Sequence, residues 1–316
     1  MRDALPTIAS PDAVARAAWH YYVQGLTQQD VALRMGVTRA RIIEWLAAAR
    51  DAGIVRVRID AKTAHGAALE AALCRRHGLA RADVVPAPVA TSSVAALVGH
   101  AAGTLLADTV TDRTTIAVGW GATLHASVRT LGAQPRAGVS VVALLGGTTH
   151  SRAMTPPAVA RRVADAFEAE CFQLTAPLVV ADDLMRRTLW REPPLRDLRT
   201  RARAADVALV SVGALTPQST LFAGGLLPRA MLASLRRAGA VGDVLGQFID
   251  VEGRAVDHPV NRRVMAVDLR DVQRVPRVIV ASGGRDKVAA LRAALRALPV
   301  HTLVTDEHAA AGLLDG

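Results

Sequence analysis

The feature that most constrains the fold is an alternation of apolar runs and amphipathic segments from Leu69 to the end of the chain. Continuous Val, Ile, Leu and Ala runs are typical of strands buried in a sheet, and each run is followed by apolar residues at helical spacing. Strands that alternate with helices indicate a parallel α/β sheet. We therefore predict a Rossmann-like α/β domain over residues 61–316. Its strands are expected at residues 82–88, 114–120, 139–147, 206–215, 276–284 and 300–306, and its helices at 69–79, 92–110, 121–131, 156–170 and 285–298.

The first 60 residues have a different pattern, which predicts a helix-turn-helix unit. Thr27 is a suitable N-cap for a short helix, and Gly36 breaks that helix where a tight turn is needed. Thr38 caps a second helix, whose Ile42, Ile43, Leu46 and Ala49 are expected to face inward. In such units the start of the second helix enters the major groove of DNA. The candidate DNA-contacting residues are Thr27, Gln28, Thr38, Arg39, Ala40, Arg41 and Glu44.

The segments on either side of this unit complete the predicted N-terminal domain. A helix starting at Ser10-Pro11 is expected to brace it through Ala13, Ala17, Trp19, Tyr22 and Val23. Residues 55–59 alternate as a strand, and the polar stretch 60–66 is the expected domain boundary. An ordinary helical hairpin, which binds no nucleic acid, is the alternative interpretation of residues 27–51.

The basic charge of the chain favours a nucleic-acid partner only weakly. The formal net charge is +10 and the isoelectric point is about 11.0, which favours a polyanionic partner. All the basic residues except Lys62 and Lys287 are arginines, however, and this bias also arises from genomic base composition. The two cysteines are far apart and form no cluster of several metal ligands, so each is expected to be a buried small apolar residue. We expect neither a metal nor a cofactor. No signal peptide or apolar run of membrane-spanning length is visible, so we expect a cytoplasmic protein.

Three glycine-containing loops follow predicted strands, where ligands bind in open α/β sheets. They contain the candidate effector-binding residues Gly119, Trp120, Gly121, Thr123, Gly146, Gly147, Thr148, Thr149, Gly283, Gly284 and Lys287. Free N–H groups at helix starts favour anions, and no Asp or Glu lies between Asp112 and Asp165. Asp243, on a glycine-flanked loop, is the candidate acceptor for sugar hydroxyl groups. These glycines are equally compatible with the tight turns of any α/β protein.

Two common classes of site are disfavoured by the same loops. The segment Gly119-x-Gly121 lacks the third glycine of a dinucleotide fingerprint, and no carboxylate follows at the spacing that binds a ribose. No Walker-type phosphate loop and no G-x-S-x-G nucleophile elbow occurs. A small anionic ligand is therefore favoured over a dinucleotide.

The order of several segments resembles the SorC family of bacterial sugar-responsive transcription regulators. These segments are YYVQGLTQQDVALRMGVTRARI, GWGATL, LLGG, APLVVAD, GAVGDVLGQFID and ASGGRDKVAALRAAL. The resemblance implies an effector domain similar to ribose-phosphate isomerases, glucosamine-phosphate deaminases and CoA-transferases. It also implies that the protein binds operator double-stranded DNA and a sugar or sugar-phosphate effector, and that it assembles as a homodimer or homotetramer. Carried over by motif, the effector site uses residues 119–123, residues 146–149, Asp243 and Lys287.

Two positions depart from the pattern of this family. Glu44 stands in the recognition helix where the family often has a basic residue, so the operator sequence is expected to differ. No lysine occurs in the middle of the effector domain, which argues against a Schiff base to a sugar aldehyde there.

Two other functions compete with a regulator. One is an active sugar-phosphate isomerase, deaminase or transferase with an appended helical domain. Such an enzyme needs placed acid–base groups near the glycine loops, where Asp243 is the main candidate and His125 and His150 are weak ones. The other is an RNA-binding protein, for which the aromatic-rich sheet signature is missing. We therefore expect a sugar-controlled, DNA-binding transcription regulator that is not an enzyme.

Overall fold

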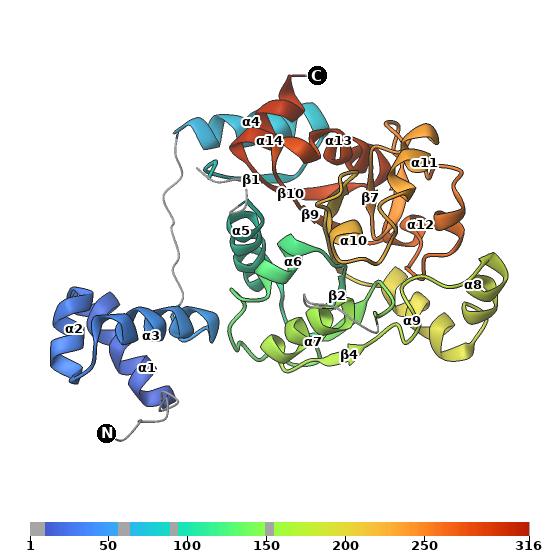
Figure 1. Ribbon diagram of the computed structural model, residues 1–316. Helices are drawn as coiled ribbons and strands as arrows, with labels where there is room; N and C mark the ends of the chain where they lie inside the picture. Colours follow the sequence, from blue (N-terminus) through green and yellow to red (C-terminus); the bar gives the residue numbers. More distant parts are fainter. Residues whose placement is uncertain (1–9, 56–63, 89–93, 149–154, 316) are drawn as a thin grey trace. The chain divides into compact units, whose positions relative to one another are not determined.

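The computed structural model describes residues 10–55, 64–88, 94–148 and 155–315 (Figure 1). The chain divides into two compact units, Met1–Ala61 and Lys62–Gly316. The predicted strand at residues 55–59 lies almost entirely outside the described residues.

The N-terminal unit contains the predicted helix-turn-helix. Helix α1 (Pro11–Ala18) continues into a π-helical turn (Trp19–Val23), and α2 (Gln28–Met35) and α3 (Arg39–Asp51) follow. The Thr27 hydroxyl caps α2, Gly36 ends it with φ +67°, and the Thr38 hydroxyl caps α3. A small core joins the three helices through Val14, Ala17, Ala18, Val31, Ala32, Ile42, Leu46 and Ala49.

Several side chains that the sequence predicted to be internal in this unit are on its surface. Ile43 is 46% exposed, because the face of α3 that packs is set by Ile42, Leu46 and Ala49. Trp19, Tyr22 and Val23 are also exposed, since the π-helical turn changes the helical spacing after α1. Tyr21 is the aromatic of this turn that packs against the core.

The second unit is built on a seven-stranded sheet in which every pairing is parallel, so the predicted fold class is confirmed. The strand order is β1-β10-β9-β5-β2-β3-β4. The strands are β1 (Arg81–Val85), β2 (Thr115–Val118), β3 (Ser140–Ala143), β4 (Glu170–Phe172), β5 (Val207–Val210), β9 (Arg277–Ala281) and β10 (Val300–Asp306).

Helices cover both faces of this sheet, and the alternation of side chains along each strand explains why. In β2, Ile116 and Val118 join one core cluster, whereas Ala117 joins the other. The first face is covered by α5 (Val94–Thr109), α6 (Ala122–Ser127) and α7 (Pro156–Phe167). The second face is covered by α4 (Ala64–His77), α9 (Pro193–Arg203), α13 (Val288–Ala297) and α14 (Glu307–Leu314).

A second, antiparallel sheet follows β5 and was not predicted. It consists of β6 (Val212–Ala214), β7 (Gly242–Val244) and β8 (Gln247–Ile249). The predicted strand 206–215 is therefore two strands, which divide at Ser211 and belong to different sheets. Short helices α8 (Asp183–Leu189), α10 (Thr220–Ala223), α11 (Met231–Arg237) and α12 (Leu269–Val272) lie in the connections.

The order of the large sheet defines where a ligand is expected to bind. From β2 the chain proceeds outward through β3 to β4, and from β5 it proceeds in the other direction through β9 to β10. The topology therefore switches between β2 and β5, which are neighbours. In open α/β sheets the crevice beyond the carboxyl ends of such strands is the usual binding site.

Candidate functional site

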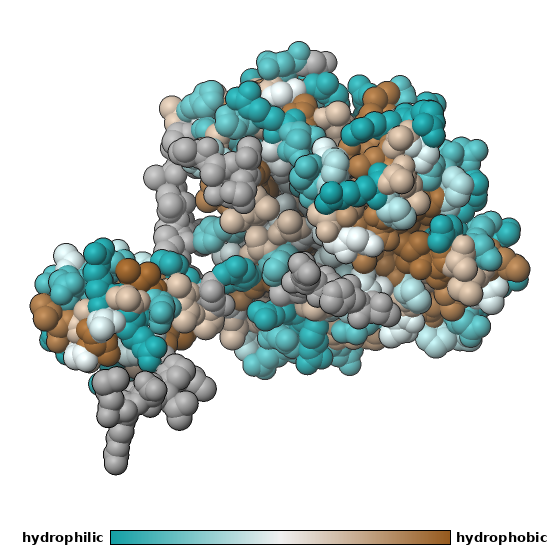
Figure 2. Space-filling model, in the orientation of Figure 1, coloured by the Kyte–Doolittle hydropathy of each residue, from teal (hydrophilic) through white to brown (hydrophobic). Residues whose placement is uncertain are grey.

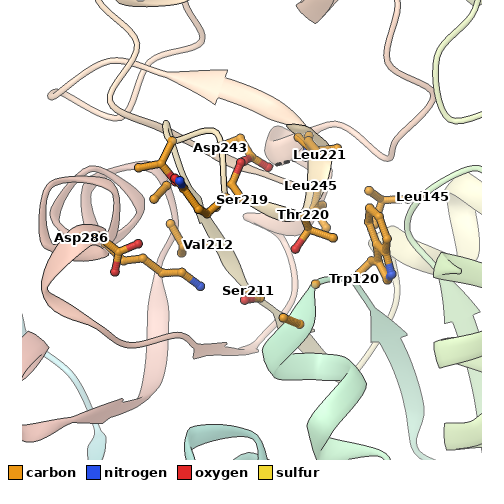
Figure 3. A pocket seen from close by; sticks show the side chains of 18 residues that line it. Trp120, Leu145, Ser211, Val212, Ser219, Thr220, Leu221, Asp243, Leu245 and Asp286 are labelled. Carbon is orange, nitrogen blue, oxygen red and sulfur yellow. Dashed lines mark hydrogen bonds between the residues drawn. The ribbon is translucent and has the colours of Figure 1, made fainter. Parts of the chain in front are cut away.

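A cavity of about 200 Å³ lies beyond the carboxyl ends of β2 and β5 (Figure 3). Trp120 and Gly121 reach it from the loop after β2, and Ser211 reaches it from the end of β5. The small antiparallel sheet contributes Asp243, and the turn before α13 contributes Lys287. The structure thus brings four sequence-predicted residues, Trp120, Gly121, Asp243 and Lys287, to one cavity.

The backbone of the loop after β2, which contains Trp120, has little freedom. The N–H of Gly119 donates to the carbonyl of Leu209 over 2.8 Å, and a Cβ at Gly119 would lie only 2.9 Å from the Leu245 side chain. Gly121 has a φ of +144°, which side chains rarely permit. Figure 3 shows Trp120 beside Leu145, on the side of the cavity away from Asp286. One wall is therefore apolar.

The carboxyl group of Asp243 occupies the opposite, polar part of the cavity. We predicted a loop for Asp243, but this residue lies in β7 and is only 8% exposed. Its Oδ2 accepts the N–H of Gly246 over 3.0 Å, and its Oδ1 packs against Gly213, where no Cβ would fit. Burial raises the pKa of Asp243 to about 6, although the Gly246 bond and the Lys287 charge act to lower it. Small changes of pH near the physiological range therefore change the fraction of Asp243 that is ionised.

Lys287 lies in a 3₁₀ turn (Arg285–Lys287) and is the residue before α13 rather than inside that helix. Its Nζ donates to Ser282 Oγ over 3.3 Å, and Ser282 Oγ donates to the Val212 carbonyl. Burial lowers the pKa of Lys287, and the charges of Asp286, Asp243 and Asp306 act in the other direction. A partly buried ammonium group beside carboxylates is chemically suited to hold an anionic or polyhydroxylated ligand.

The other two predicted loops contribute less than expected to this cavity. Gly146 packs against the backbone of Ala176 and Pro177, and Gly147 and Thr148 line a separate groove. Thr149 and His150 lie outside the described residues. Thr123 is buried beneath the cavity loop, and its hydroxyl has no partner among the described residues.

The loop of Gly283 and Gly284 packs on an internal carboxylate. The N–H of Gly284 donates to Asp306 Oδ1 over 2.7 Å, and Asp306 is fully buried. This N–H group, which we predicted to be free for an anion, is therefore occupied. A Cβ at Gly283 would lie 2.5 Å from the same carboxylate oxygen, which explains the glycine. The loop serves the cavity mainly by placing Asp286 and Lys287.

Sequence reasoning missed a polar segment that also lines the cavity. Gln218, Ser219 and Thr220 follow β6 and reach the cavity together with Ser211 and Asp286. The Ser219 hydroxyl is buried and has no partner among the described residues. The signal was present, because the polar run T-P-Q-S-T follows the predicted strand 206–215 just as the glycine loops follow theirs.

In the N-terminal unit, the predicted DNA-contacting residues gather around the start of α3. Arg39 Nε donates to Gln28 Oε1 over 3.3 Å, which joins α2 to α3, and Arg41 lies 3.7 Å from Glu44. Arg39, Ala40 and Glu44 are exposed. The hydroxyls of Thr27 and Thr38 act as helix caps, so the threonines hold the helix starts in place.

The fold and cavity define a class of protein: a helix-turn-helix unit joined to an α/β domain with a ligand cavity at its topological switch point. Residues 61–315 match the family model described as "Putative sugar-binding domain". The chain is 33% identical over 313 residues to the transcriptional regulator LsrR of Klebsiella pneumoniae, covering 97% of this chain and 94% of that protein. It is 30% identical over 309 residues to LsrR of Escherichia coli K12, covering 96% and 94%.

Solved structures show the same fold. The full-length sorbitol operon regulator SorC from Klebsiella pneumoniae aligns with a TM-score of 0.71 at 22% identity, covering 96% of this chain and 98% of that one. A DeoR family transcriptional regulator from Listeria monocytogenes aligns with a TM-score of 0.73 at 22% identity, covering 78% and 99%. The chain belongs to the SorC family of transcriptional regulators with a sugar-binding domain. None of the helices in the described ranges is long and apolar enough to cross a membrane.

Proposed function

We propose that this protein regulates a carbohydrate-metabolism operon in the cytoplasm and that its effector is a phosphorylated monosaccharide. The single observation that carries the proposal is the cavity of about 200 Å³ in which Lys287 and Asp243 converge. That volume suits a single sugar rather than a dinucleotide. Lys287 is the residue that meets the phosphate, because it supplies a compact cation that a free sugar does not need.

The polar and apolar walls suggest how such a ligand is oriented. The carboxyl group of Asp243 and the hydroxyls of Ser219 and Thr220 are acceptors and donors for sugar hydroxyl groups. Trp120 and Leu145 provide an apolar surface for the C–H face of the ring. The contribution of the Gly284 N–H is removed by its bond to Asp306, so the ammonium group of Lys287 carries most of the charge recognition.

The proposed output is operator binding by the N-terminal unit. Arg39 and Arg41, at the first turn of α3, are positioned to read base edges, as arginines commonly do. One helix-turn-helix contacts few base pairs, so we propose that the protein acts as a homodimer or homotetramer on a two-fold symmetric operator.

We further propose that the cavity binds its ligand without converting it. A sugar isomerase or deaminase needs an acid and a base that face the reacting carbons. The candidate acid–base groups that line the cavity are Asp243, Asp286 and Lys287, and Asp243 is already bonded to Gly246. His125 and His258 do not line it. The appended-enzyme alternative therefore has little support from the site.

A thermal-shift screen of monosaccharide phosphates and the matching free sugars tests this function. A ligand at 100 times its dissociation constant stabilises the folded state by about 2.7 kcal/mol, which is a measurable rise in Tm. We expect one sugar phosphate to raise Tm and its free sugar to have little effect. If the free sugar stabilises equally, the cavity recognises a neutral polyol. Turnover of the stabilising ligand, abolished by Asp243→Ala, would instead establish an enzyme.

A further inference from the structure

Helix α8 presents two adjacent large apolar side chains to solvent. Leu184 is 66% exposed and Met185 is 47% exposed, although α8 lies in the well-packed effector domain. Figure 2 shows that hydrophobic residues gather on this face between α10 and α8. Single exposed apolar residues are ordinary, but a contiguous apolar surface is typical of a binding face.

A groove is lined in part by the segment that leads into α8. Its volume is about 620 Å³, and its lining includes Pro177, Leu178, Val179, Gly224, Gly225 and Leu226. Val179 forms a backbone bridge to Val264, and Arg186 of α8 donates to the carbonyl of Val264 over 2.9 Å. Val264 therefore contacts both the groove wall and the helix, which connects the groove to α8.

The charges of α8 identify the kind of partner. Asp182 caps the helix and Asp183 is its first residue, whereas Arg186 and Arg187 lie in its last turn and Arg191 follows its end. The apolar pair lies between the two charged ends. A second α8 that runs antiparallel across a two-fold axis would place its basic end against this acidic end, and the reverse. Such self-complementarity is what an isologous interface requires. Within this set, Asp183 forms an ion pair with Arg187 at 3.1 Å, which is exposed and lies within the helix, so it contributes little by itself.

We propose that this surface pairs with a second copy of the chain, with the two α8 helices antiparallel at the two-fold axis and the groove of each copy extending the contact. The proposal rests on the proposed homo-oligomer and names its interface. A seven-residue helix is only about 10 Å long, which is too short for the roughly 800 Å² that each partner buries in a standard interface. The neighbouring groove supplies the additional area, so the helix and the groove must act together.

Sedimentation velocity of the full-length protein, without DNA or ligand, tests the interface. We compare the wild type with Leu184→Glu and Met185→Glu, using Leu97→Glu on α5 as the matched control, because Leu97 is a similarly exposed leucine at 40%. A buried negative charge at the centre of an interface weakens association on the order of tenfold or more. At micromolar protein we expect both α8 variants to have half the wild-type assembly mass, whereas Leu97→Glu keeps the wild-type mass.

A charge-swap experiment separates pairing between copies from the ion pair within one helix. Asp183→Arg and Arg187→Asp each give both positions of α8 the same sign of charge. In either variant alone, like charges then face one another between copies, so the assembly mass should fall to half that of the wild type. Mixed together, the two variants have complementary helices and should regain the wild-type mass. An effect confined to the helix itself predicts no recovery on mixing.

The possible outcomes test the α8 interface separately from the proposed homo-oligomer. If all the α8 variants keep the wild-type mass, the copies pair through another surface, and the proposed oligomer stands without this interface. If the wild type itself is a monomer with and without operator DNA, both the interface and the proposed oligomer are wrong. Recovery on mixing, together with the loss caused by Leu184→Glu, establishes the interface.

Discussion

At the scale of single residues, the cavity that Lys287 shares with Asp243 gives a reason for a lysine at position 287. Every other basic residue except Lys62 is an arginine, and arginine at position 287 would place a larger, forked group beside Ser282. The sequence identified Lys287 and Asp243, but it did not identify the strand environment that buries Asp243. That environment is formed by β6 and β7. Each of these strands has only three residues, which is too short to show a recognisable alternation of apolar and polar residues.

The first prediction concerns the charge of Lys287. Lys287→Met keeps the length of the side chain and removes its charge, so the charge-assisted bond to a phosphate is lost. We expect sugar-phosphate affinity to fall tenfold or more, about 1.4 kcal/mol, and the weak affinity for the free sugar to stay the same. Arg285→Met, an exposed cation of the same turn, is the control. Calorimetric titration measures all three proteins, and an equal loss in the control would deny Lys287 a specific role.

The second prediction concerns the pH dependence of stability that Asp243 produces. Its folded pKa of about 6 lies above the ordinary value of 3.8, so the folded state holds this proton more tightly than the unfolded state. Stability must therefore fall as the pH rises from about 4 to above 6, by up to about 3 kcal/mol. Asp243→Asn still accepts the Gly246 N–H and does not ionise. Its Tm should exceed that of the wild type by more at pH 8 than at pH 5. A constant difference would place the folded pKa of Asp243 near its ordinary value.

At the scale of elements, strands in continuous apolar runs and capped helices were predictable, whereas irregular elements were not. The runs that form β2, β3, β9 and β10 are continuous and apolar, and Thr27, Gly36 and Thr38 mark helix ends by their own chemistry. The run 206–215 is equally apolar, but Ser211 turns the chain from one sheet into another. Ile43 has the right hydrophobicity for a core residue. Its exposure follows from packing between helices, which no local pattern contains.

The third prediction belongs to helix α3. Arg39→Ala and Arg41→Ala should each reduce operator affinity by about 1–3 kcal/mol and relax the preference at one base position, if each side chain reads a base edge. Arg34→Ala, on the exposed end of α2, removes the same charge and should cost less. Fluorescence anisotropy with labelled operator variants measures both affinity and base preference. Wild-type binding by both α3 variants would show that another surface reads the DNA.

At the scale of the whole molecule, the separation into two units suggests that one unit binds DNA and the other binds the ligand. The helix-turn-helix unit has its own core, and the effector domain has its own cavity. We expect ligand binding in the second unit to change DNA binding by the first. Linkage then requires that the sugar phosphate and the operator change each other's affinity by the same factor.

The fourth prediction concerns the operator. Two N-terminal units related by a two-fold axis should protect two half-sites whose centres are one helical turn of DNA, about 34–36 Å, or a multiple of it apart. Footprinting of the native operator reads out the spacing. Inserting half a helical turn between the half-sites should weaken binding strongly, whereas inserting a full turn should weaken it less. Indifference to both insertions would indicate that each unit binds independently.

The central claim is that a sugar phosphate in the β2/β5 cavity controls operator binding. Its most direct test is the operator affinity of the wild type and Lys287→Met, measured with and without the sugar phosphate that gives the largest thermal shift. The coupling typical of allosteric proteins is about 1–3 kcal/mol, a factor of 5–150. We predict a change of that size in the wild type and almost none in Lys287→Met, whose operator affinity without ligand equals that of the wild type. The same change in both proteins, or none in either, would contradict the account.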